Sequence, residues 1–169
     1  MDAEFSSDRG KVEKRIKREK INVFSRLPTV YAASRRQGQK LLQIGGGLTI
    51  VEWRTLWDLH EVGPASIREL AAIQHADHSL LSRALPDMRR KGLIEMKRDP
   101  EDGRQSIVAL TDAGLAAYNA AAPIMKRRRN ALREAFTEEE LAAFTGFLDR
   151  LEDFLRLPVD DIIKEKDPA

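Results

Sequence analysis

The sequence of 169 residues contains no cysteine. This absence excludes disulfide frameworks, thiol nucleophiles, thiol redox sensing and zinc sites with cysteine ligands. The sequence also lacks any stretch close to the roughly 18 consecutive apolar residues that a transmembrane helix needs. Its first residues lack the basic-then-apolar pattern of a signal peptide. We therefore expect a soluble, cytoplasmic protein without a membrane partner.

The common catalytic motifs are missing as well. The sequence contains no Gly-x-Ser-x-Gly, His-Glu-x-x-His, P-loop or dinucleotide-binding motif. His75 and His78 flank Asp77, but a metal site needs three or four ligands, and the neighbouring sequence supplies no clear third one. The sequence thus predicts a protein that is not an enzyme and that needs neither a metal nor a cofactor.

The net charge of the whole chain is small, but its segments differ in charge. The 29 Lys and Arg residues and 27 Asp and Glu residues leave a net charge of only +2. Residues 1–65 and 66–136 each carry +4, whereas residues 137–169 carry −6. A basic body with an acidic end suits a chain that presents one face to a polyanion such as nucleic acid, although ordinary solvated helix surfaces carry such charges too. We interpret the basic run 126–129 as a solvated surface of that kind.

Helix signals organise the N-terminal part of the chain. Residues 1–20 are polar and charged and predict a flexible arm that becomes helical against a partner. A helix is expected from its N-cap Ser25 to about Gln43, with Pro28 at the third helical position, where no backbone hydrogen bond is lost. The glycines at 45–47 end it. The apolar residues expected on its buried side are Leu27, Val30, Tyr31, Leu41 and Leu42.

Capping signals mark the later helices. In a capping box, a Ser or Thr side chain caps the helix start and a Glu three residues later bonds back to it. Asp77 is the expected cap of a further helix that runs to about Lys91, where Gly92 suits a left-handed C-cap. This helix has an apolar stripe of Leu81, Leu85 and Met88. The capping boxes pair Thr49 with Glu52, Ser66 with Glu69, and Thr137 with Glu140.

Between residues 93 and 110 the hydrophobic period changes from that of a helix to that of a strand. Residues 93–98 and 105–110 predict two strands, and the turn residues 99–104 join them into a hairpin with a charged tip. Thr111 then caps a long Ala-rich helix in which Pro123 predicts a kink.

The last helix carries apolar residues in a strict heptad pattern, accompanied by Phe147 and Phe154. That much apolar surface on a terminal helix implies packing against another helix, which a second copy of the chain would supply. The heptad residues, expected to form a dimer interface, are Leu141, Phe144, Leu148, Leu151 and Leu155.

A short helix, a turn, a longer helix and a hairpin follow the order of a winged helix-turn-helix. The sequence therefore predicts a mainly α fold with a small β-hairpin wing (α+β). The side of the longer helix opposite its apolar stripe is free to enter a major groove, where Arg83 can pair bidentately with guanine. Arg104 at the hairpin tip suits a narrow minor groove, with Asp102 holding its guanidinium. The candidate DNA contacts are His78, Ser79, Ser82 and Arg83 on the helix and Lys97, Arg98, Asp102 and Arg104 on the wing.

At these residues the sequence resembles the MarR family of transcriptional regulators. The resemblance rests on Trp53 in the helix before the motif, on the stretch 63–71 and on the wing pair Asp102-x-Arg104. It also rests on the stretch 81–94, whose last four residues are Lys-Gly-Leu-Ile. It implies a homodimer whose first and last helices interleave and a pseudo-palindromic operator in double-stranded DNA. In many members it also implies release from DNA by a small ligand.

Two residues depart from the family pattern. Position 75, often glycine in the turn between the two motif helices, is His75 here. A left-handed conformation is strained for His, so we expect a turn that differs in detail. Pro86 lies inside the recognition helix and removes one backbone hydrogen bond, which predicts a kink or an early end. The expected base-reading residues all lie before it.

These patterns and the resemblance give a domain plan. We expect an effector pocket lined by Tyr31, Trp53 and Trp57, although plain core packing explains the same spacing. The expected segments are a basic flexible arm (1–20), a dimerisation helix (21–47), a winged helix-turn-helix domain (48–110, wing 97–105), a long linker helix with a C-terminal dimerisation helix (111–157), and an acidic tail (158–169).

The expected function is that of a homodimeric transcriptional regulator, a repressor rather than an activator, that responds to an unidentified small molecule. The alternative is a winged helix that binds protein through its wing and arm. Salt separates the two, because DNA binding through several phosphates weakens steeply between low and moderate salt.

Overall fold

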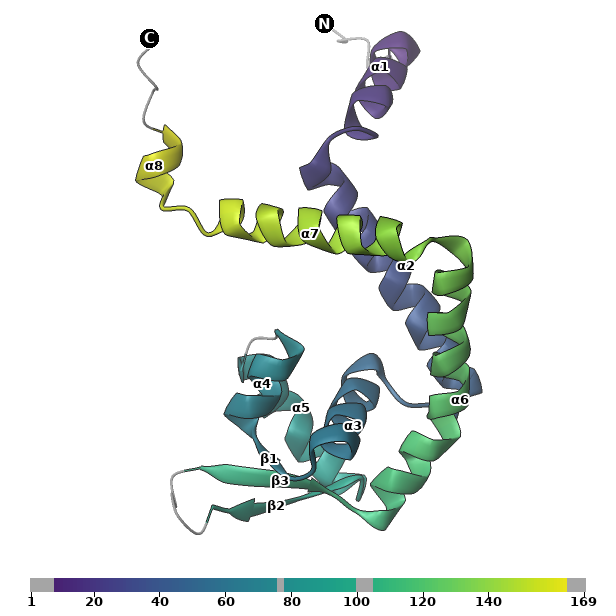
Figure 1. The fold of residues 1–169 in the computed structure, drawn as a ribbon, viewed down its shortest axis with the longest axis vertical. Helices are drawn as coiled ribbons and strands as arrows, with labels where there is room; N and C mark the ends of the chain where they lie inside the picture. The colour runs from purple at the N-terminus through teal and green to yellow at the C-terminus, as the bar shows by residue number, and fades with distance from the viewer. Residues whose placement is uncertain (1–7, 76–77, 100–104, 164–169) are drawn as a thin grey trace, which may run out of the picture. The chain divides into compact units, whose positions relative to one another are not determined.

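The computed structural model describes residues 8–75, 78–99 and 105–163 (Figure 1). The chain divides into two compact units, Met1–Met125 and Lys126–Ala169. The described part is mainly helical with one small antiparallel sheet, which confirms the predicted fold class. Within this part, no helix combines the length and the apolar character needed to cross a membrane.

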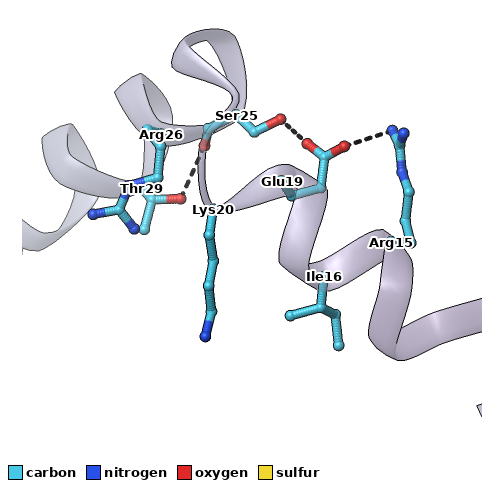
Figure 2. A pocket seen from close by; sticks show the side chains of 7 residues that line it. All are labelled: Arg15, Ile16, Glu19, Lys20, Ser25, Arg26 and Thr29. Atoms are coloured by element: carbon cyan, nitrogen blue, oxygen red, sulfur yellow. Dashed lines mark hydrogen bonds and ion pairs between the residues drawn. The ribbon is translucent and has the colours of Figure 1, made fainter. Parts of the chain in front are cut away.

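Two helices form the N-terminal part. α1 (Arg9–Glu19) begins at Asp8, whose side chain accepts a hydrogen bond from the Lys11 backbone N–H at 3.1 Å. The Glu19 carboxylate accepts a hydrogen bond from Ser25 and pairs with Arg15, one turn earlier, at 2.8 Å (Figure 2). Such i, i+4 ion pairs support a helix. The segment predicted as a flexible arm therefore contains a helix.

α2 (Val23–Ile44) begins at Asn22, so the predicted N-cap Ser25 is wrong. The Asn22 side chain accepts a hydrogen bond from the Phe24 backbone N–H at 3.0 Å, and Asn is among the residues that cap helices best. Pro28 consequently lies deeper in the helix than predicted, where its missing N–H leaves the Phe24 carbonyl without its helical donor. The helix nevertheless continues through Pro28 to Ile44.

Three helices and three strands build the centre of the first unit. The sheet is antiparallel with the strand order β1-β3-β2; Ile94 pairs with Leu110, and Ala65 pairs with Val108. In Figure 1 the three helices lie on the same side of this sheet. The elements are α3 (Ile50–Val62), β1 (Ala65–Ser66), α4 (Ile67–Gln74), α5 (His78–Arg90), β2 (Ile94–Arg98) and β3 (Ser106–Leu110). β1 escaped prediction because two residues are too few to show alternation.

The three predicted capping boxes are all present. Each has both of its bonds, from the backbone N–H of the Glu to the Ser or Thr side chain and from the cap backbone N–H to the Glu side chain. The boxes begin α3, α4 and α7 (Glu138–Leu155). Gly92, with φ 73°, adopts the left-handed conformation predicted for it after α5.

One hydrophobic core holds the first unit together. Leu81, Leu85 and Met88 are all buried, which confirms the predicted stripe of α5. On α2 the prediction holds only in part, because Leu42 is buried whereas Val30 and Tyr31 are 50% and 64% exposed. The buried apolar residues are Leu42, Leu48, Trp53, Leu56, Leu59, Ala65, Leu70, Leu81, Leu85, Met88, Ile94, Val108, Ala121 and Met125.

α6 (Asp112–Ala135) begins beside the base of the β2–β3 hairpin. Thr111 Oγ1 accepts a hydrogen bond from the Gly114 backbone N–H at 3.0 Å and donates one to the Gly92 carbonyl at 2.5 Å. Thr111 is therefore the cap that the sequence predicts, and it also ties the new helix to the end of α5. α6 continues through Pro123 to Ala135.

The second unit contains α7 and α8 (Val159–Ile163), and neither helix has a buried residue. α8 lies within the segment predicted as an acidic tail and carries Asp160 and Asp161 in its first turn. The Asp161 backbone N–H donates to the Pro158 carbonyl at 2.9 Å, which closes the first turn of α8.

Candidate nucleic-acid interface

α5 has an apolar side and a polar side. Its apolar side, formed by Leu81, Leu85 and Met88, is buried in the core. Burial of this stripe fixes the rotation of the helix about its axis. The four residues predicted to contact DNA consequently lie away from the core, with Ser82 half-buried and His78, Ser79 and Arg83 exposed.

Two contacts order the side chains at the start of α5. Ser82 Oγ lies 3.2 Å from His78 Nδ1, and Arg83 Nε donates a hydrogen bond to the Ser79 carbonyl at 3.1 Å. Because this bond uses Nε, the two terminal nitrogens of the Arg83 guanidinium are left for a bidentate contact. The start of α5 thus offers hydroxyl, imidazole and guanidinium groups to a base edge or a phosphate.

The turn before α5 keeps the left-handed conformation that is unfavourable for His. His75 has φ 46° and ψ 42°, so the expected change in this turn is wrong. The neighbouring Gln74 is buried and makes two hydrogen bonds to α3. Its carbonyl accepts from Arg54 at 2.9 Å, and its side-chain amide donates to Thr55 at 3.4 Å.

Of the two outcomes predicted for Pro86, the early end is wrong, because α5 continues to Arg90, and the kink stays a prediction. The residue after α5, Lys91, binds the buried Glu52 of α3 at 2.7 Å and Asp87 at 3.0 Å. The pair with Glu52 anchors the C-terminal end of α5 to α3, whereas the pair with Asp87 is local.

The electrostatics of this anchor are self-consistent. Burial raises the pKa of Glu52, but hydrogen bonds from Lys91 and Thr49 outweigh it and hold that pKa below its usual value. Hydrogen bonds to Glu52 and Asp87 raise the pKa of Lys91. Glu52 is therefore charged at neutral pH despite its burial. The sequence identified Glu52 only as a capping residue, since nothing in the spacing reveals its contact with Lys91.

The structure describes the wing at its base, residues 97–99 and 105. Lys97 and Arg98 are exposed at the end of β2, and Lys97 pairs with Glu95 at 2.9 Å. The Asp99 backbone N–H donates to the Gln105 carbonyl at 3.0 Å and extends the hairpin by one bond. The predicted tip residues Asp102 and Arg104 lie outside the described residues.

Known proteins resemble this chain over the region just described. The sequence profile of the MarR family matches residues 48–106. Over 68 residues the chain is 37% identical to the transcriptional repressor IacR of Pseudomonas putida, covering 40% of this chain and 41% of IacR. It is 31% identical over 106 residues to the uncharacterised regulator YxaD of Bacillus subtilis, covering 63% of this chain and 74% of YxaD. The chain belongs to the MarR family.

The fold agrees with this membership. A mutant MarR from E. coli, solved in complex with operator DNA, matches with a TM-score of 0.61 at 20% identity, over 77% of this chain and 98% of that one. The fold of this MarR-family chain is therefore the predicted winged helix. The relatives are transcriptional regulators and not enzymes, as expected of this chain. The matched region spans less than half of IacR.

Aromatic rings of this MarR-family chain stack between α3 and α6. The Trp53 ring lies 5.4 Å from Tyr118 and 6.0 Å from Trp57, and His60 lies 4.2 Å from Tyr118. The structure thus brings together two of the three residues of the expected effector pocket. It adds His60 of the same helix and Tyr118 of α6. Tyr118 could not be predicted for this role, because its helix is distant in sequence from α3.

The third residue of that expected pocket, Tyr31, lies on α2. Its ring is 64% exposed and lies 5.7 Å from the Arg35 guanidinium carbon. This contact lies within one helix and is a cation–π pair rather than part of the aromatic stack.

The five predicted dimerisation residues lie along α7. Phe144, Leu148 and Leu155 are exposed, and Leu141 and Leu151 are half-buried. Their neighbours Phe147 and Phe154 are exposed as well. α7 of this MarR-family chain thus presents an apolar side that its own described residues do not bury.

Proposed function

We propose that this MarR-family regulator is a sequence-specific DNA-binding protein, a homodimeric repressor that binds a pseudo-palindromic operator. The polarity of α5 carries the proposal. The apolar stripe of α5 is fully buried, so the helix turns its short polar side chains and Arg83 away from the core. A helix that enters a major groove requires such a polar side. The likeness to a MarR protein solved with operator DNA supports this use of the fold.

We propose the following roles for the parts of the chain. Residues 48–110 bind DNA, with α5 in the major groove and the wing 97–105 at the adjacent minor groove. The segments 21–47 and 111–157 form the homodimer, which accounts for the exposed apolar residues of α2 and α7. Because IacR is a repressor, repression rather than activation is the proposed mode.

A small aromatic molecule is the proposed effector. Trp57 and Tyr118 are half-buried and stack on the buried Trp53 ring, and stacked aromatic rings bind flat apolar ligands well. The chain has only these two tryptophans, so its tryptophan fluorescence reports on this stack alone. We expect phenolic or aromatic carboxylate compounds that quench this fluorescence to weaken DNA binding. A compound that quenches the emission without changing DNA affinity would contradict the proposed coupling.

The decisive experiment is a selection of genomic fragments by the purified protein, read out by sequencing. Arg83→Ala and Arg104→Ala serve as test variants, and Arg133→Ala, in the last turn of α6, serves as the matched control. The wild-type and control proteins should enrich fragments that share one inverted repeat. Loss of the Arg83 contact should remove about 1–3 kcal/mol of discrimination and blur the repeat.

The outcomes separate the proposed function from its rival. An inverted repeat that both test variants lose supports the operator-binding regulator. A folded dimer that enriches no fragment at any salt concentration overturns DNA binding and favours a winged helix that binds protein.

A further inference from the structure

A cavity of ≈ 410 Å³ lies where three elements of the winged helix meet. Its walls come from the start of α4, the start of α5 and the start of β3. The lining residues are Ser66, Ile67, Arg68, His78, Gln105 and Ser106. Only His78 belongs to the predicted DNA contacts, so the cavity adds a second group of polar residues beside them.

Five of the six residues that line the cavity have polar or charged side chains, and Arg68 gives it a positive charge. Arg68 is exposed and makes no recorded ion pair within the described part of the chain. The neighbouring acid Glu69 does not line the cavity, because its carboxylate accepts hydrogen bonds from the backbone N–H and the hydroxyl of Ser66 at 2.7 and 2.8 Å. Arg68 is thus the only fully charged residue among the six that line the cavity.

The cavity lies between the start of α5 and the start of β3, and this position indicates which ligand it binds. In the proposed complex, α5 occupies a major groove and the wing reaches the adjacent minor groove. The sugar–phosphate backbone separates these two grooves, so it has to pass between the start of α5 and the start of β3. The cavity lies at that place and is bordered by residues of both elements.

We propose that this cavity binds a backbone phosphate of the operator, with Arg68 as its principal contact. His78 and Gln105 border the same site and can donate hydrogen bonds to the phosphate oxygens. His78 then positions the protein on DNA instead of reading a base, which leaves Ser79, Ser82 and Arg83 as base-reading candidates. This inference rests on the proposed DNA-binding function.

A phosphate contact has a signature that a base contact lacks. Arg68→Gln should weaken binding about 3- to 10-fold, equally for the selected operator fragment and for a random-sequence duplex of about three helical turns. The slope of log K against log salt should become shallower by about 1 per protomer. Arg68→Lys keeps the charge and should largely restore both quantities. Fluorescence anisotropy with end-labelled duplexes over a salt series measures them.

Two further variants complete the experiment. Gln105→Glu places a negative charge in the cavity and should weaken binding to both duplexes, whereas Arg133→Gln removes a positive charge of α6 that does not line the cavity and should change neither affinity nor slope. Thermal unfolding that is unchanged in Arg68→Gln confirms that its fold is intact, as expected for an exposed side chain.

The inference and the proposed function fail differently. If wild-type protein binds DNA but Arg68→Gln behaves like Arg133→Gln, the phosphate site is wrong and the proposed function stands. If Arg68→Gln loses only operator binding, Arg68 reads a base, which also overturns the phosphate site. If wild-type protein binds neither duplex at low salt, the proposed function fails and the inference fails with it.

Discussion

Glu52 and Asp58 are both acidic residues of α3, yet their surroundings shift their pKa values in opposite directions. Glu52 receives hydrogen bonds from Lys91 and Thr49, which lower its pKa despite burial. Asp58 has one carboxylate oxygen that is buried without a hydrogen-bond partner among the described residues. Burial raises the pKa of Asp58, and the nearby Gln74 and Arg54 do not fully offset this effect. The two residues should therefore affect stability oppositely.

Asp58→Asn should stabilise the protein at neutral pH by about 1 kcal/mol, because it removes a charge whose desolvation is incompletely compensated. The folded-state pKa of Asp58 is raised, so the charged form disfavours folding above that pKa and has no such effect below the usual value. The gain should thus vanish as the pH falls towards about 4. Urea unfolding at a series of pH values measures it, and a variant less stable than wild type at pH 7 would contradict it.

Glu52→Gln should destabilise the protein at neutral pH by about 1–2 kcal/mol. The amide keeps the shape of the capping residue but loses the charge that Lys91 binds at 2.7 Å. Since the folded-state pKa of Glu52 is lowered, its contribution is complete above the usual value and is lost as the pH falls through the folded-state pKa. The difference from wild type should therefore shrink below about pH 4. A difference that persists undiminished in acid would assign it to packing instead.

At the scale of elements, the start of α6 depends on close contact with Leu93, the residue before β2. A Cβ atom at Gly114 would overlap the Leu93 carbonyl oxygen, which belongs to backbone and cannot rotate away. Gly114→Ala should therefore lower the free energy of unfolding by about 2–3 kcal/mol, because α6 has to move from the base of the wing. Chemical denaturation measures this change.

Gly146 provides the matched control, since it lies inside α7 and a Cβ atom there meets nothing within 4 Å. Gly146→Ala should be neutral or stabilise by about 0.5–1 kcal/mol through helix propensity alone. Equal effects of the two substitutions would show that the contact between Gly114 and Leu93 does not hold α6 in place.

Elements with a local chemical signal could be predicted from the sequence. The three capping boxes, the Gly92 C-cap, the hairpin and the buried stripe of α5 depend on residues within a few positions of each other, and all are present. The misplaced N-cap of α2 is a local error, since Asn22 and Ser25 lie three positions apart, but the errors at His75 and Pro86 involve contacts distant in sequence. Gln74, next to the left-handed His75, bonds to Arg54 and Thr55, and Lys91, directly after α5, binds Glu52. All three partners lie on α3.

The same distinction applies to the candidate site. The polar side of α5 follows from helical periodicity, so the sequence placed its four residues together. The cavity beside it escaped prediction because Arg68 and Gln105 are 37 positions apart and meet only through the pairing of β1 with β3. The stack of Trp53 with Tyr118 likewise joins helices far apart in sequence.

At the scale of the whole molecule, the apolar residues of α7 need a partner. Phe144, Phe147 and Leu155 are each more than half exposed, and the capping box ensures that the helix presenting them is well formed. Apolar side chains at a heptad spacing gain about 1.5–3 kcal/mol each when they are buried. Several such residues exposed together favour association, and a second copy of the chain offers the same surface in return.

Leu148→Glu should therefore convert the proposed dimer into a monomer. The substitution places a charge in the middle of the heptad seam, and in a symmetric dimer two such charges would be buried close together without partners. Ala143→Glu adds the same charge to an exposed position of α7 outside the heptad and should leave the dimer intact. Light scattering measures the mass in solution. Binding to the operator duplex should weaken in the monomer, because a monomer engages only one half-site. If the mass of Leu148→Glu matches that of wild type, the apolar side of α7 packs within its own chain and the dimer has to form elsewhere.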